Sequence, residues 1–242
     1  MITSLENKRV KDWCRLHQKK YRTEEYLLYD PELINAAYTT GHLRTLIYTG
    51  HLPFPFENTE EVSKEVLFKI SEGRDISYAG VASFIEEKKT YDSRVLILDH
   101  LQDPLNVGRI LETAERFGFD TVLLSDNSPD LYNEKALEAS KGAIYRVSVC
   151  HGDLIEEIEK LRAMGFYVAS TGLRGETAEL YDVSPREKMA IVLGNEGSGV
   201  SEEVMDASDE IIKIDMKHID SLNVGMAAAV AAYRFRKIYQ DE

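Results

Sequence analysis

The sequence of 242 residues is poor in the features that mark disulfide frameworks, metal sites and membrane spans. It has two cysteines, Cys14 and Cys150, and neither these nor the six histidines show a metal-ligand spacing. A run of about 18 apolar residues is missing, so no transmembrane helix is expected. The first residues also lack the apolar core of a signal peptide. We therefore expect a cytoplasmic protein with free thiols, no metal and no membrane contact.

Positive charge is scarce as well, and the formal net charge is −13. This argues against indiscriminate binding to nucleic acid, because phosphate contacts need Lys and Arg. The charge is uneven, however, since residues 1–22 carry seven Lys and Arg against two acidic residues. Two interpretations stay open for this segment. It is either a solvated helix face or a local RNA-backbone contact through Lys19, Lys20 and Arg22.

The pattern of the first 85 residues predicts a small α/β unit. The polar segment 86–93 that follows is typical of a linker. We therefore predict one domain over residues 1–88 and a second over residues 94–242. In the first domain the predicted helices cover residues 4–20, 31–38 and 60–71, and the predicted strands cover residues 26–29, 44–48 and 79–85.

Strands and helices alternate from residue 95 onward, which predicts a parallel sheet covered by helices on both faces. The fold class expected for the chain is therefore α/β. The predicted strands are residues 95–99, 121–124, 144–149, 166–170, 189–193 and 210–214. The predicted helices are residues 104–117, 133–140, 153–164, a short one from residue 201, and 221–238.

The most informative stretch begins at the predicted strand 189–193, which runs into three glycines within six residues. Glycine lets the backbone take positive φ and approach a ligand closely. A second strand, residues 210–214, precedes an Ala-rich helix for which Ser221 is a natural N-cap. Two strand ends and one helix start therefore fall together, where open α/β sheets bind their ligands.

An earlier segment, residues 99–118, carries a second signal. Asp103 and Pro104 are typical of a helix start, and Gly118 stands where that helix should end. Asn106 and Gly108 are both poor helix formers, so helix formation does not explain them.

These segments together resemble a known family. Leu-Gly-Asn-Glu-Gly-Ser-Gly-Val-Ser, then Ile-x-Met and Ser-Leu-Asn-Val, with Asp-Pro-x-Asn-x-Gly upstream, are similar to the motifs of the SpoU-type (TrmH-like) RNA ribose 2′-O-methyltransferases of the SPOUT superfamily. The resemblance covers residues 95–236 and extends more weakly over residues 1–85. It implies transfer of methyl from S-adenosylmethionine to a ribose 2′-hydroxyl of rRNA or tRNA. It also implies a trefoil knot in the C-terminal domain, an N-terminal RNA substrate-binding domain and a homodimer.

The resemblance also implies roles for single residues. The residues expected at the reaction centre are Asn106, Arg109, Glu196, Ser221 and Asn223. The residues expected at the cofactor are Thr171, Gly172, Leu193, Gly194, Asn195, Gly197, Ile214, Met216, Ser221 and Leu222. Two roles stay open for Glu196, which is either a base or an acceptor that orients its neighbours.

One departure from the family pattern bears on activity. The arginine of the first motif, usually placed at the substrate hydroxyl, falls at Glu112, and Arg109 lies one turn earlier on the same helix face. Arg109 either supplies the missing guanidinium or only pairs with Glu112. Gly225 stands where the family has serine. The alternatives are a non-catalytic RNA- or cofactor-binding member of the same fold, or an unrelated nucleotide-binding α/β enzyme.

Overall fold

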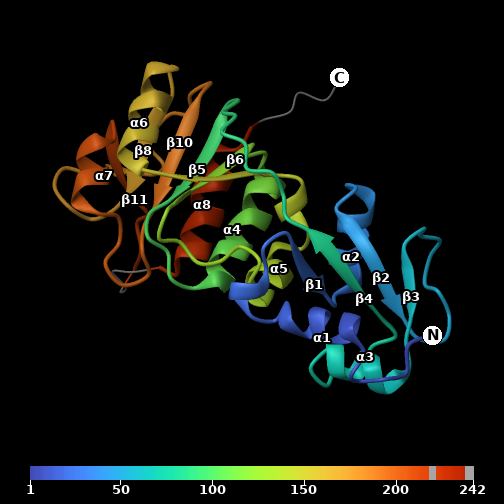
Figure 1. Ribbon diagram of the computed structural model, residues 1–242. Coiled ribbons are helices and arrows are strands. Elements are labelled where there is room, and N and C mark those ends of the chain that lie inside the picture. The colour runs from blue at the N-terminus through green and yellow to red at the C-terminus, as the bar shows by residue number, and fades with distance from the viewer. Residues whose placement is uncertain (218–221, 238–242) are drawn as a thin grey trace, which may run out of the picture. The chain divides into compact units, whose positions relative to one another are not determined.

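The computed structural model describes residues 1–217 and 222–237. The chain forms two compact units, Met1–Glu86 and Glu87–Glu242, and Figure 1 labels their helices and strands. Within the described residues, no helix is long and apolar enough to cross a membrane. Cys14 and Cys150 are both free thiols, as the sequence predicts.

The first unit is a four-stranded mixed sheet with three α-helices. Its strand order is β1-β4-β2-β3, antiparallel except for the parallel pair β2–β3. The strands are β1 Glu25–Leu28, β2 Leu43–Tyr48, β3 Thr59–Glu61 and β4 Tyr78–Ser83. The helices are α1 Lys8–Arg15, α2 Pro31–Thr39 and α3 Lys64–Ile70, with a 3-10 turn at Lys19–Tyr21. Val10 and Trp13 of α1 pack into the core of this unit.

Two predictions for the first unit are wrong in extent. The helix predicted over residues 4–20 begins at Lys8, because Asn7 rather than Ser4 caps it by accepting from the Arg9 N–H. The helix predicted over residues 60–71 is shorter, since its first residues form β3. Ser63 then caps α3 by accepting from the Val66 N–H.

The second unit is a seven-stranded sheet in which every strand pair is parallel. Its order is β7-β6-β5-β10-β8-β11-β9. The strands are β5 Arg94–Leu98, β6 Thr121–Ser125, β7 Ser148–Gly152, β8 Tyr167–Thr171, β9 Ala178–Glu179, β10 Met189–Leu193 and β11 Glu210–Lys213. The central strands β5 and β10 are buried along their whole length, which explains their continuous apolar sequences.

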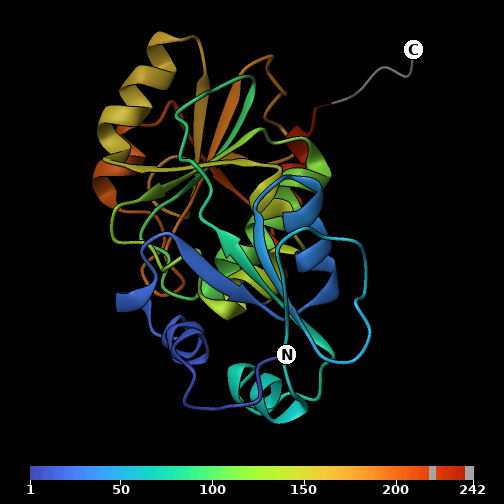
Figure 2. The same ribbon diagram turned by 45° about the vertical axis from the view of Figure 1, so that its right-hand side comes forward.

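Helices cover both faces of this sheet, as the alternating pattern predicts. The helices are α4 Pro104–Phe117, α5 Glu134–Ser140, α6 Leu154–Ala163, α7 Glu202–Ala207 and α8 Val224–Phe235. Figures 1 and 2 show α6 and α7 on one face and α4, α5 and α8 on the other. Ile158 and Leu161 of α6 pack against the strand residues Ile97 and Val192. This parallel sheet with helices on both faces confirms the predicted α/β fold class.

Three details of the second unit differ from the predictions. The strand predicted over residues 144–149 begins at Ser148, because Ala143–Tyr145 is a 3-10 turn. The two-residue strand β9 was not predicted. The last helix begins at Val224 with Asn223 as its N-cap, so the predicted cap at Ser221 is wrong, and Ser221 itself lies outside the described residues. The trefoil knot implied by the resemblance stays a prediction.

The segment predicted as a linker is fixed to the second unit by a buried carboxylate. Lys89 Nζ and the Tyr91 hydroxyl bond to Glu157 of α6 at 2.8 and 2.7 Å, and Lys160 Nζ adds a third bond at 2.9 Å. Burial raises the pKa of Glu157, but these donors outweigh it and lower that pKa to about 2. Glu157 is therefore ionised, and residues 89–91 are held in place without regular secondary structure.

Candidate functional site

The loop after β10 folds back on itself. The backbone N–H groups of Asn195 and Gly199 each donate to the carbonyl of the other at 3.0 Å, and Gly199 has a left-handed φ of 74°. A Cβ at Gly194 would lie 2.1 Å from the carbonyl carbon of Gly199 and from the nitrogen of Val200. Only glycine fits at position 194, because the returning backbone occupies the space of any side chain.

We call residues 194–200 the glycine loop. Asn195 and Asp99 anchor this loop to the segment that follows β5. Asn195 Oδ1 accepts from the N–H groups of Gly197 and Ser198 at 2.8 and 3.1 Å, while its Nδ2 donates to the His100 carbonyl at 2.6 Å. Asp99 is 1% exposed and accepts from the Ser201 N–H at 2.7 Å. Both ends of the loop are therefore anchored to the neighbouring strand.

The Glu196 carboxylate accepts three hydrogen bonds from the start of α4. The donors are the backbone N–H of Gln102 at 3.0 Å, the backbone N–H of Asp103 at 3.1 Å, and Asn106 Nδ2 at 2.9 Å. Partial desolvation raises the pKa of the Glu196 carboxyl, but the Asn106 amide and the backbone donors outweigh it, and the pKa is lowered. Glu196 is thus an ionised, occupied acceptor, which favours an orienting role over that of a base.

Asn106 links Glu196 to the start of α8. Its Oδ1 accepts from Asn223 Nδ2 at 3.2 Å, and Asn223 Oδ1 caps α8 by accepting from the Gly225 N–H at 3.0 Å. The structure therefore brings Glu196, Asn106 and Asn223 into one chain of hydrogen bonds. It also explains Asn106, which helix formation left unexplained.

Gly108, the other unexplained residue of α4, has a packing role. A Cβ at this position would lie 2.3 Å from the Ala136 carbonyl oxygen and 2.7 Å from the Ala139 Cβ of α5. Glycine is needed here because the two helices approach too closely for any side chain.

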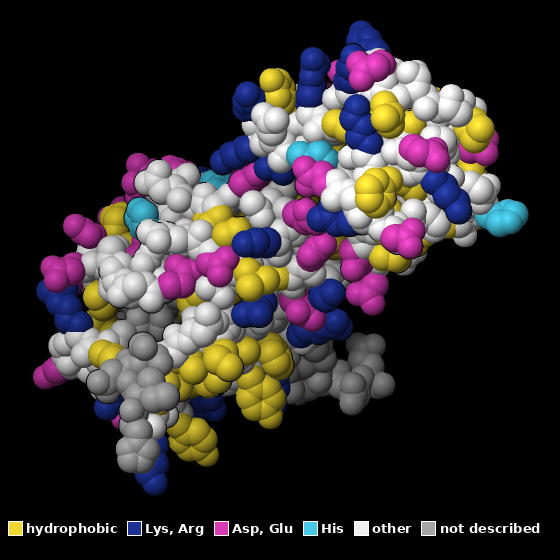
Figure 3. Space-filling view, turned by 90° about the horizontal axis from the view of Figure 1, so that it is seen from below, with side chains coloured by type: hydrophobic (Ala, Val, Ile, Leu, Met, Phe, Trp, Pro, Cys, Tyr) yellow, Lys and Arg dark blue, Asp and Glu magenta, His cyan; other side chains and the backbone are white. Residues whose placement is uncertain are grey.

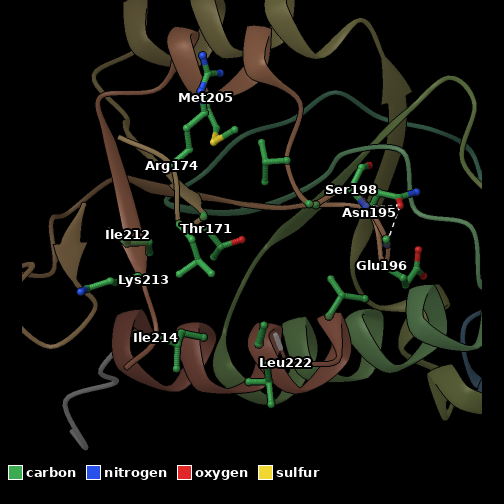
Figure 4. Close-up of a pocket in the computed structure, with 18 of the residues that line it drawn as sticks. Thr171, Arg174, Asn195, Glu196, Ser198, Met205, Ile212, Lys213, Ile214 and Leu222 are labelled. Atoms are coloured by element: carbon green, nitrogen blue, oxygen red, sulfur yellow. Dashed lines mark hydrogen bonds between the residues drawn. The ribbon is translucent and has the colours of Figure 1, made fainter. Parts of the chain in front are cut away.

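A cavity of about 610 Å³ opens beside the glycine loop, at the carboxyl ends of β8, β10 and β11. Its volume lies within the range typical of small-molecule sites. Figure 4 shows Asn195 and Glu196 at one side of this cavity, Ile212 and Lys213 at the other, and Ile214 and Leu222 along the helix side. The predicted cofactor residues that line it are Thr171, Gly172, Gly194, Asn195, Gly197, Ile214, Met216 and Leu222.

Two predicted cofactor residues are placed differently. Leu193 is fully buried in the last position of β10, where its side chain belongs to the core. Ser221 falls outside the described residues. Asn223, expected at the reaction centre, caps α8 next to the lining residues Leu222 and Val224.

The prediction missed cavity-lining residues that lie outside the family motifs. Leu173 and Arg174 follow β8, while Glu202 and Met205 come from α7. Arg174 and Glu202 form an ion pair at 3.1 Å. The position of residues 173 and 174 directly after a predicted parallel strand was a usable signal, because strand carboxyl ends share one edge of the sheet.

Arg109 and Glu112 lie on consecutive turns of α4 but have different surroundings. Glu112 pairs with Arg116 at 3.7 Å, and no Arg109–Glu112 ion pair forms among the described residues. Arg109 is exposed, and its stem runs beside Gly225 at the start of α8. Of the two roles left open for Arg109, the structure removes the simple pairing with Glu112.

The three basic residues predicted to contact RNA lie in the first unit. Lys19 and Lys20 belong to the exposed 3-10 turn, and Lys20 Nζ lies 4.8 Å from the ring centroid of Tyr21. Tyr21 is 44% exposed. Arg22 is half-buried, so the accessible positive charge of this turn resides in the two lysines.

The chain is similar to several known proteins. The model of the SpoU rRNA Methylase family matches residues 93–233. The 23S rRNA (guanosine(2553)-2′-O)-methyltransferase RlmP of Bacillus subtilis (strain 168) is 29% identical, over 97% of this chain and 98% of its own. A putative TrmH family tRNA/rRNA methyltransferase of Staphylococcus epidermidis is 37% identical over 68% of each chain. The AdoMet-bound rRNA methyltransferase from Sinorhizobium meliloti has a TM-score of 0.84 at 24% identity, over 96% of this chain and 95% of that one.

The glycine loop provides a direct test of the cavity. Gly194→Ala should weaken binding of S-adenosylhomocysteine, the product of the cofactor expected from the sequence, by at least about tenfold, because the added methyl displaces the loop. Gly197→Ala is the matched control, since a Cβ there would meet its nearest atom, Asn195 Oδ1, at 3.4 Å. Calorimetric titration measures both affinities, and equal losses in the two variants would contradict this account.

Proposed function

The chain belongs to the SpoU rRNA methylase family, and from that premise we propose that it transfers a methyl group from S-adenosylmethionine to a ribose 2′-hydroxyl of RNA. The observation that carries the proposal is the cavity bounded by the glycine loop and joined to the Glu196–Asn106–Asn223 hydrogen-bond chain. The names of the relatives, which specify rRNA and tRNA/rRNA, support RNA as the substrate class.

The lining of the cavity fits this cofactor. The backbone at Gly194 and Gly197 presents N–H and C=O groups to an adenine edge, and Ile214 and Leu222 supply apolar surface for its faces. When bound, the cofactor supplies an activated methyl group on a sulfonium, so no metal is required for the transfer. The protein's own residues then have to hold the ribose hydroxyl in line with that methyl.

Glu196 contributes to this geometry through its bonds rather than by taking a proton. Its oxygens already accept from Gln102, Asp103 and Asn106, and its pKa is lowered by the side-chain and backbone donors against the effect of burial. A carboxylate of this kind is a weak base. We assign it the task of fixing the glycine loop against α4.

Methyl transfer to unmodified total RNA tests the proposal. We expect label from methyl-labelled S-adenosylmethionine to appear in 2′-O-methylated nucleosides, identified by mass spectrometry after digestion. Glu196→Ala should lower turnover by about 10²-fold, the scale of a small misplacement of reacting groups. Wild-type protein that binds S-adenosylhomocysteine but labels no RNA would contradict the proposal and identify the non-catalytic alternative.

The proposal assigns RNA contacts to the basic turn of the first unit. Replacing Lys19 and Lys20 by Glu should weaken RNA binding. It should also make the slope of log affinity against log salt concentration shallower, by the amount that corresponds to the loss of about two phosphate contacts. Reversal at Lys64 and Lys135, two other exposed lysines, is the control and should change the slope less. Equal slopes for the wild type and both variants would contradict the RNA contact and support the alternative, in which the turn is only a solvated surface.

A homodimer is part of the same proposal. Met226, Val230 and Tyr233 form an exposed stripe on α8, with exposures of 61, 42 and 58%, and the Tyr233 ring contacts Phe117 of α4 at a centroid distance of 5.9 Å. Figure 3 shows one larger group of exposed hydrophobic side chains on the face seen from below, besides others scattered singly over that face. Helix stripes of this kind are typical of surfaces covered by a partner.

A charge in the stripe should break such a dimer. Val230→Glu should shift the protein from dimer to monomer in analytical ultracentrifugation, because an unpaired carboxylate is costly in a dry interface. Met164→Glu, at the exposed C-cap residue of α6, which is 44% accessible, should leave the mass unchanged. A wild type that sediments as a monomer at every concentration would refute the homodimer.

A further inference from the structure

Arg109 is exposed, and the stem of its side chain lies beside Gly225 at the start of α8. Arg109 follows Asn106 by three residues on α4, so the two side chains share one helix face. Asn106 in turn bonds both Glu196 and Asn223. The backbone of Arg109 is therefore held by the same helix turn that orients the site, and its stem projects along the start of α8.

Gly225 leaves the space in which the Arg109 stem lies. A Cβ built at Gly225 would be 3.6 and 3.7 Å from Cβ and Cδ of Arg109, and 3.2 Å from Asn223 Oδ1. One methyl group would already fill this gap. The hydroxyl of a serine, which the family pattern has at this position, would compete with the arginine stem or with the Asn223 cap.

The charge of Arg109 is not neutralised within the part of the chain that the structure describes. Glu112, the nearest candidate by helix spacing, has Arg116 as its partner at 3.7 Å. Among residues 1–217 and 222–237, no carboxylate forms an ion pair with the Arg109 guanidinium. In a chain of net charge −13, a free cation beside the site suits an anionic ligand such as an RNA phosphate.

We propose that Arg109 is the catalytic cation of this enzyme and that Gly225 is the substitution that accommodates it. The inference rests on the proposed methyl transfer. The guanidinium donates to the ribose oxygen or its adjoining phosphate and stabilises the charge that develops there. The ribose oxygen gains the methyl as the sulfonium–carbon bond breaks, and the hydroxyl proton passes to water. The guanidinium acts here as a fixed positive charge and hydrogen-bond donor rather than as a base, since guanidinium groups do not lose their proton in proteins.

A double-mutant cycle tests the pairing of Arg109 with Gly225. Arg109→Ala should lower turnover by about 10²-fold, the scale for loss of one charge-stabilising donor, with little change in S-adenosylhomocysteine affinity. Arg109→Lys should restore part of the rate, since the charge remains. Gly225→Ser should lower turnover in the wild type but have little further effect in Arg109→Ala, because the side chain it crowds is already gone.

The control is Arg116→Ala, which removes an exposed arginine from the same helix and should leave turnover nearly unchanged. An active wild type whose turnover survives Arg109→Ala would overturn this inference and leave the methyl transfer intact. Equal losses from Gly225→Ser in both backgrounds would overturn the role of Gly225. A wild type without transfer, in which Glu112→Arg creates activity, would overturn both the inference and the proposed function.

Discussion

The site depends on one anion, the carboxylate of Glu196, and on the three donors that hold it. Its oxygens accept hydrogen bonds from the backbone N–H groups of Gln102 and Asp103 and from the side-chain amide of Asn106. These donors lie at the N-terminal end of α4, where the helix dipole also favours negative charge. With them, the loop after β10 is held against α4, and through Asn106 and Asn223 against α8. Three segments distant in sequence thus share one set of polar contacts.

The close packing around this anion dictates where glycine must stand. Gly194 allows the loop to return over the end of β10, and Gly108 allows α4 to lie on α5. Both positions are determined by neighbouring backbone rather than by a ligand. The cavity then results from the parallel sheet, because β8, β10 and β11 all end at the same edge. The close backbone packing around the loop and the open cavity beside it therefore lie at the same edge of the sheet.

Local signals predicted some elements to the residue. The α4 bounds follow from the Asp103 cap, Pro104 and the left-handed Gly118, and β10 follows from its continuous apolar run. The cap of α8 was misassigned because Ser221 and Asn223 are both good caps by sequence. The α8 N-cap in the structure is Asn223, which is also bonded to Asn106, a contact that spans 117 positions. The strands β3 and β9 depend on pairing with distant strands and have little local pattern.

The residues around the cofactor cavity could likewise be predicted only where a local sequence motif marks them. The motif residues of the glycine loop line the cavity, but Arg174, Glu202 and Met205 join them only through tertiary packing. A crystal structure of the protein with S-adenosylhomocysteine tests the account most directly. We predict the adenine between Ile214 and Leu222, beside Gly194, with the Glu196 carboxylate still bonded to Asn106. A ligand bound outside this cavity, or a Glu196 side chain turned away from Asn106 to contact the ligand, would contradict the account.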